Sequence, residues 1–221
     1  MRITNFECRM KKELKGLIER PEKKKIYVVS IRQTDLGKIH RLILTSLSKG
    51  QAISPQGIAD NININLDAVT RHLKTLDEND IIRFKEGKIE SAYPFTTKPT
   101  THQLIIGQSK TYALCAVDAL GVPSMLQKDV SITSSCSYCE KSIAVDFQQS
   151  EVNANPGNLV VWMPRKKVEG KSVNCMCPHI DFFCNREHAD SWQEKIGYQG
   201  VVLNLREAIE VGEFIFGDFL K

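Results

Sequence analysis

The spacing of hydrophobic residues between positions 34 and 95 predicts three helices followed by a β-hairpin. The helices are expected at residues 36–47, 54–62 and 65–80, and the strands at 81–87 and 88–95. Ser54 is a favourable N-cap followed by Pro55 at the first helical position, and Asn65 caps the third helix. This order of elements is typical of a winged helix-turn-helix module.

Beyond residue 100, short β-rich runs alternate with helical segments. Strands are expected at residues 129–136, 141–149, 158–164, 179–183 and 201–205, and helices at 185–196 and 206–220. The Thr-rich segment 96–103 predicts a linker or an irregular strand edge. We therefore predict an α+β fold, in which a winged-helix-like helical domain (34–100) is followed by a small, mostly antiparallel sheet with flanking helices (101–221).

The first 33 residues form a basic extension with a weaker pattern. A weakly amphipathic start ends at Pro21, and the run at 23–31 is expected to form a short strand. Cys8 lies apart from the other cysteines, so we expect it to have a packing or surface role.

Charge is distributed unevenly along the 221 residues. Residues 1–100 carry 19 Lys and Arg against 12 Asp and Glu, whereas residues 51–100 alone have a net charge of −1. The predicted third helix offers Arg71, His72 and Lys74, but it also contains four acidic residues. Because DNA binding depends on neutralising phosphates, we expect this module to serve the fold rather than nucleic acid.

Composition predicts a globular protein with reduced thiols. Hydrophobic residues make up 42% of the chain, and no apolar run approaches the roughly 20 residues of a membrane span. The N-terminus lacks the apolar core of a secretory signal. Seven cysteines, an odd number, favour metal or redox chemistry over structural disulfides. We expect a cytoplasmic protein without membrane association.

A thiol and a carboxyl stand one helical turn apart within residues 111–123. This run predicts a helix ended by Gly121 and Pro123. Cys115 and Asp118 would share one face among apolar neighbours. Burial would keep Asp118 protonated, and a thiol beside a proton acceptor can become a reactive or metal-binding thiolate. A buried structural Cys beside a capping or salt-bridged Asp is the alternative interpretation.

Two further cysteine pairs flank the predicted strands. Cys136 and Cys139 form a Cys-x-x-Cys pair, and Cys175 and Cys177 form a Cys-x-Cys pair. Together they offer four thiolates for a tetrahedral Zn(II) site if the fold brings the pairs together. The five histidines are scattered, and we expect them on the surface or in packing rather than as ligands.

Six segments between residues 111 and 214 occur in a characteristic order: TYALCAVDAL, VSITSSC, SEVNANPGNLVVWMP, CPHIDFF, HADSW and REAIEVGEF. In order and spacing they resemble the organomercurial (alkylmercury) lyases. That family also has a winged-helix-like N-terminal domain that serves the fold, which agrees with the pattern before residue 95.

The resemblance implies roles for individual residues. Cys115, Asp118 and Cys177 would be the catalytic residues and the ligands of mercury, and Cys136 would match a mainly structural Cys. The remaining cysteines beyond residue 100 have no counterpart in the family pattern: Cys139, Cys175 and Cys184.

The expected chemistry is protonolysis of a carbon–mercury bond in an organomercurial substrate. Mercury is a soft ion that thiolates capture. One thiolate would bind it, the second would polarise the carbon–mercury bond, and Asp118 would protonate the carbon. No cofactor is required, and Cys115 and Cys177 would hold the product Hg(II) until small-molecule thiols or a mercuric-reductase-type acceptor remove it. Two other functions stay open: a soft-metal carrier, and a metal sensor that uses the winged helix to bind DNA.

Overall fold

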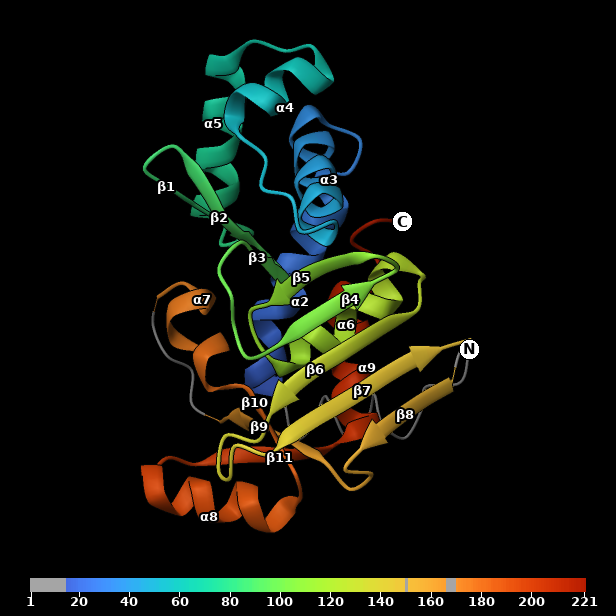
Figure 1. Ribbon diagram of the computed structural model, residues 1–221. Helices are drawn as coiled ribbons and strands as arrows, with labels where there is room; N and C mark the ends of the chain where they lie inside the picture. The colour runs from blue at the N-terminus through green and yellow to red at the C-terminus, as the bar shows by residue number, and fades with distance from the viewer. Residues whose placement is uncertain (1–14, 150, 166–169) are drawn as a thin grey trace, which may run out of the picture.

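An eight-stranded antiparallel sheet contains the predicted β-hairpin at residues 81–95, which is the wing of the winged-helix part, and most strands of the second half of the chain (Figure 1). The computed structural model describes residues 15–149, 151–165 and 170–221, so Cys8 lies outside the described residues. The helices are α2 (Lys15–Ile31), α3 (Asp35–Ser48), α4 (Pro55–Ile62), α5 (Leu66–Glu78), α6 (Ala116–Leu126), α7 (Ser172–Cys175), α8 (Arg186–Ile196) and α9 (Leu205–Phe216), with the 3-10 helix η1 (Cys177–His179).

The large sheet has the strand order β1-β2-β3-β5-β4-β6-β7-β8. Its strands are β1 (Ile82–Lys85), β2 (Lys88–Ala92), β3 (Phe95–Thr96), β4 (Gln103–Ile106), β5 (Ser109–Ala113), β6 (Val130–Ser135), β7 (Ser142–Gln148) and β8 (Glu151–Asn155). A second sheet, of order β10-β9-β11, contains β9 (Val160–Pro164), β10 (Asp181–Phe183) and β11 (Gly200–Asn204). The predicted α+β class with a winged-helix-like N-terminal part is confirmed.

The three helices predicted between residues 36 and 80 are confirmed, and so are the two predicted N-caps. Ser54 Oγ accepts a hydrogen bond from the Gly57 N–H at 3.0 Å, and Asn65 Oδ1 accepts one from the Asp67 N–H at 2.7 Å. The apolar faces of these helices meet in a core of fully buried side chains: Ile39, Ile43, Leu44, Ile58, Val69, Leu73 and Leu76. Local propensity and burial therefore favour the same structure here.

The strand predicted at residues 23–31 is wrong, because this segment belongs to α2. The helix also continues through Pro21, where we expected a stop. Val28 and Ile31 are buried three positions apart, whereas Ile26 and Val29 are exposed, so the apolar run is divided by a helical period. Packing on the core outweighs the strand preference of the β-branched residues.

The helix predicted around Cys115 begins later and ends later than expected. Residues up to Ala113 belong to β5, and α6 runs through both predicted terminators, Gly121 and Pro123. The helix is buried almost all round, between the sheet and α9, and this packing outweighs the hydrogen bond that Pro123 removes (Figure 1). Gly121 is used for close helix packing against α9 rather than as a cap.

The segment predicted as a linker or an irregular strand edge, 96–103, connects β3 to β4 of the large sheet, and only its first and last residues belong to strands. β3 pairs with β2 on one side and with β5 on the other, so strands before and after position 100 belong to one hydrogen-bonded sheet. The division of the chain at that position stays a prediction. Among the described residues, no helix has both the length and the apolar composition needed to cross a membrane.

Candidate functional site

Cys115 and Asp118 are held together by the first turn of α6. Cys115 is the N-cap, with an extended backbone, and its Sγ accepts a hydrogen bond from the Asp118 N–H at 3.3 Å. The Ala116 N–H donates to the Ile180 carbonyl at 3.0 Å, which joins this turn to the segment between η1 and β10. The thiol and the carboxyl are therefore neighbours because of helix capping rather than mid-helix spacing.

Cys177, the first residue of η1, completes a cluster of three side chains. Its Sγ donates to Asp118 Oδ2 at 3.8 Å, although the two residues are 59 positions apart in sequence. One ligand atom from each of Cys115, Asp118 and Cys177 lies within 4.8 Å of the others. The three residues are only 1%, 5% and 6% exposed, respectively. The structure thus brings together the three residues that the sequence singles out.

Burial controls the ionisation of this cluster. It raises the pKa of Asp118 to about 7, although hydrogen bonds from the two thiols act to lower it. Burial also raises the pKa of Cys115 well above its usual value. The hydrogen bond from Cys115 acts to lower the pKa of Cys177, but burial and the charge of Asp118 outweigh it and keep that pKa raised. Both thiols are therefore held in the protonated form more firmly than an exposed cysteine.

The loop that carries Cys177 is anchored to the N-terminal part of the chain. Ser172, the first residue of α7, donates from its Oγ and its backbone N–H to Asp80 Oδ2, at 2.8 and 3.1 Å. The Lys24 Nζ lies 2.6 Å from the same Asp80 oxygen and donates to Ser172 Oγ at 3.0 Å. Burial raises the pKa of Asp80, but Lys24 and Ser172 outweigh it and hold the value below its usual range.

Tyr93 also links the loop that carries Cys177 to the N-terminal part of the chain. Its hydroxyl donates to Asp80 Oδ1 at 3.1 Å and accepts the Val173 N–H at 2.7 Å, and the Lys24 ammonium lies 3.8 Å from its ring centroid. Sequence analysis missed Lys24, Asp80 and Tyr93 because they belong to no motif. The sequence predicts only a basic extension in this region, whereas the Lys24 side chain is 12% exposed and pairs with Asp80.

The four-thiolate Zn(II) site considered from sequence is wrong. Cys177 lies with Cys115 and Asp118, while the Cys175 Sγ donates to the Lys171 carbonyl of its own loop at 3.1 Å. Cys136 and Cys139 instead meet Cys184 and His188, a histidine expected on the surface or in packing. The described part of the chain therefore contains two separate clusters of soft ligands.

Two family models match parts of the chain. The family described as alkylmercury lyase matches residues 95–217, and the family described as winged helix-turn-helix DNA-binding matches residues 36–83. An alkylmercury lyase from Staphylococcus epidermidis is 24% identical over 178 residues, covering 80% of this chain and 81% of that protein. One from Streptomyces lividans is 22% identical over 173 residues, covering 78% and 79%.

A solved structure has the same overall arrangement. The crystal structure of the mercury-bound form of MerB2 superposes with a TM-score of 0.77 at 26% sequence identity, covering 92% of this chain and 99% of that chain. The similarity therefore includes both the winged-helix part and the part that carries the buried cluster.

Proposed function

Because the chain belongs to the alkylmercury lyase family of enzymes that cleave carbon–mercury bonds, we propose that it performs this reaction by protonolysis at Cys115, Asp118 and Cys177. The observation that carries the proposal is the buried cluster of two thiols and one carboxyl within 4.8 Å. It combines the two soft ligands that mercury requires with a group that can move a proton.

Substrate capture begins at Cys177. Its thiol donates to Asp118 Oδ2 at 3.8 Å in the free enzyme, so the carboxylate is in place to accept its proton. Transfer of that proton to Asp118 leaves a thiolate, which displaces the small-molecule thiolate from an organomercurial R–Hg–SR′. The displaced thiolate takes up a proton from solvent.

Cleavage requires a second thiolate and a proton. As Cys115 bonds to mercury, its thiol proton is released and replaces the one that Asp118 donates. The electron pair of the carbon–mercury bond goes to carbon, which receives the proton of Asp118 and leaves as R–H. Mercury stays in the +2 state throughout, bound by the thiolates of Cys115 and Cys177. A carboxyl with a pKa of about 7 suits this exchange, because near neutral pH it can both accept and donate a proton.

The products leave by ligand exchange. Small-molecule thiols can take Hg(II) from Cys115 and Cys177 because all of these ligands are soft. The three side chains hold every group that the balanced reaction needs, so the proposed chemistry requires no cofactor. A mercuric-reductase-type acceptor for the released ion remains part of this proposal.

A turnover assay tests the proposal. The reduced full chain is mixed with an organomercurial and excess small-molecule thiol, and the hydrocarbon is measured by gas chromatography. We expect multiple turnovers for the wild type, and rates at least about 100-fold lower for Cys115→Ser, Cys177→Ser and Asp118→Ala. Cys175→Ser is the matched control, because serine can keep the hydrogen bond to Lys171 and the residue takes no part in the proposed reaction.

Two results would contradict this assignment. Unchanged hydrocarbon release in the three cluster variants would show that the chemistry occurs elsewhere. Stoichiometric mercury binding without hydrocarbon release by the wild type would instead indicate a carrier or a sensor.

A further inference from the structure

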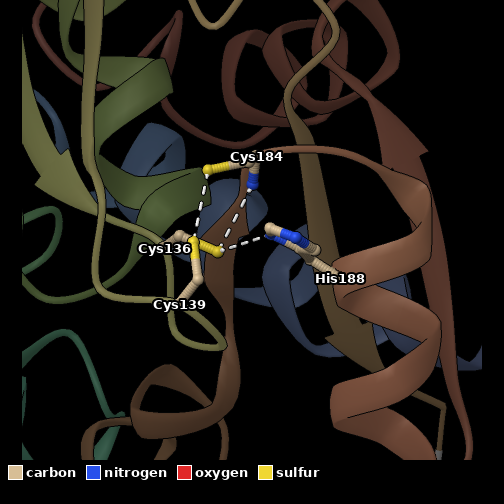
Figure 2. A group of neighbouring side chains, drawn as sticks. All are labelled: Cys136, Cys139, Cys184 and His188. Carbon is tan, nitrogen blue, oxygen red and sulfur yellow. Dashed lines mark hydrogen bonds between the residues drawn. The ribbon is translucent and has the colours of Figure 1, made fainter.

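A second cluster of soft ligands lies where the two sheets meet. Cys136 directly follows β6, Cys139 lies in the turn before β7, Cys184 directly follows β10, and His188 lies in the first turn of α8. Figure 2 shows the four side chains pointing toward one another from the β6–β7 turn, the end of β10 and the start of α8. Their ligand atoms all lie within 4.8 Å of one another.

Two distances in this cluster match those expected around a tetrahedral zinc ion. Zn–S bonds of about 2.3 Å and Zn–N bonds of about 2.0 to 2.1 Å place two sulfurs about 3.8 Å apart, and a sulfur and a nitrogen about 3.6 Å apart. The Cys139 and Cys184 Sγ atoms are 3.7 Å apart, and Cys136 Sγ lies 3.5 Å from His188 Nδ1. These two distances join separate pairs of the four ligand atoms, and the other ligand–ligand distances are no longer than 4.8 Å.

The backbone around the cluster is arranged to support a bound ion. The Cys184 N–H donates to Cys136 Sγ at 3.4 Å, a contact that stabilises a thiolate. The turn between Cys136 and Lys141 is closed by hydrogen bonds from Glu140 N–H to the Cys136 carbonyl at 2.8 Å and from Cys136 N–H to the Lys141 carbonyl at 2.9 Å. The Tyr138 ring packs beside the His188 imidazole, with centroids 5.1 Å apart.

We propose that Cys136, Cys139, Cys184 and His188 bind one Zn(II) ion at a site separate from the mercury site. Four protein ligands fill a tetrahedral shell and leave no position for a substrate, which is the pattern of a structural zinc site. The three thiols release their protons to solvent as the ion binds. No oxidation or reduction is involved.

The ion would join the two sheets of the fold. Two ligands come from the turn between β6 and β7 in the large sheet, and the other two follow β10 of the small sheet. The Ser137 N–H already donates to the Phe182 carbonyl across this junction, at 3.2 Å. Because η1 and β10 lie in one continuous segment, zinc at residue 184 would also restrain the segment that begins at Cys177.

Metal analysis of the full chain tests the site without reference to lyase activity. The protein is expressed with added zinc and without mercury, purified with a reductant, and analysed for metal by mass spectrometry. We expect about one zinc per chain in the wild type, and a zinc content lower by about tenfold or more in Cys139→Ser and in His188→Ala. Cys175→Ser and Cys177→Ser are the matched controls and should keep the ion.

Cobalt substitution provides a measurement on the wild type, in case a ligand variant does not fold. Co(II) in the site should give the intense visible bands of a tetrahedral ion together with sulfur-to-cobalt charge-transfer absorption. Added Zn(II) should abolish both signals. His188→Cys keeps four ligands and should restore the zinc content that His188→Ala loses.

Three outcomes would overturn the proposal. The first is a reduced wild-type protein that contains no zinc and gives no thiolate–cobalt signal. The second is zinc that is lost in Cys177→Ser but kept in Cys139→Ser. The third is a bond between Cys139 and Cys184 that persists under reductant, which would make this pair a disulfide.

Discussion

Gly121 of α6 and Gly212 of α9 pack directly against each other, and neither position has room for a side chain. A Cβ atom on Gly212 would lie 2.7 Å from the Gly121 nitrogen, and one on Gly121 would lie 2.8 Å from the Gly212 carbonyl oxygen. The two helices therefore cross backbone to backbone. This contact sets the position of α6, whose first turn carries the proposed catalytic pair.

Substitution at this helix crossing should weaken the fold and the site together. We expect Gly212→Ala to lower the free energy of unfolding by about 1 to 3 kcal/mol, because the helices must move apart. Urea unfolding followed by circular dichroism measures the effect. Gly57→Ala in α4 is the control, since a Cβ there meets its nearest atoms at 3.4 and 3.5 Å and should change stability by no more than about 1 kcal/mol. Equal effects at both positions would contradict the role of the close crossing.

The buried carboxyl should make stability depend on pH. The pKa of Asp118 is raised to about 7 from 3.8, so between these values the folded chain keeps a proton that the unfolded chain has lost. This contribution to the free energy of unfolding is present in full below about pH 4 and decreases as the pH rises through 7. Between pH 5 and pH 8 the wild type should lose about 2 to 3 kcal/mol more than Asp118→Asn. Urea unfolding of both proteins at the two pH values provides the comparison, and parallel changes would show that Asp118 is not the group responsible.

Lys24 should tune the proposed reaction from outside the cluster. Its charge acts to lower the pKa of Asp118 and of Cys177. We therefore expect Lys24→Met to move the pH profile of kcat/KM upward by several tenths to about one pH unit, while Lys24→Arg should keep the profile near that of the wild type. Lys25→Met is a matched control, because Lys25 pairs with Asp218 near the C-terminus. A profile that does not move in Lys24→Met would leave this lysine with a purely structural role.

The winged-helix part should not bind DNA. Residues 51–100 carry a net charge of −1, which opposes the phosphate neutralisation on which such binding depends. Fluorescence anisotropy with a random-sequence duplex at low salt should show no binding by the wild type. The double variant Asp67→Lys, Glu78→Lys replaces two acidic residues of α5 with basic ones and should bind measurably, which checks the assay. Salt-sensitive binding by the wild type that is lost in Arg71→Ala would contradict the prediction.

Secondary structure was predicted most accurately from the sequence where helix caps and the pattern of buried residues indicate the same element. The caps at Ser54 and Asn65 and the apolar faces of α3 to α5 are of this kind. The pattern failed for α2, because the β-branched run at 26–31 fits a strand equally well until the core that it packs against is known. It also misplaced the start of α6. An N-cap Cys115 and Asp118 in the first turn have the same sequence spacing as two residues one turn apart within a helix.

Contacts between distant segments could not be derived from spacing alone. Cys177 was linked to Cys115 only through the resemblance to a family, and the structure places its thiol beside Asp118. The pairing of Cys136 with His188 joins a turn to a helix 52 positions away. No local pattern contains that relationship, because it depends on how the two sheets meet.

The position of β3 has a consequence for how the molecule unfolds. This two-residue strand is hydrogen-bonded to the wing through β2 and to the catalytic half through β5. Strands in the middle of a sheet cannot separate without uncovering the backbone groups of both neighbours. The wing and the catalytic half should therefore unfold in one cooperative transition. A fragment that begins after residue 100 would leave β5 as an unprotected edge, prone to pairing with other chains. We therefore expect the N-terminal part to protect the catalytic half against aggregation.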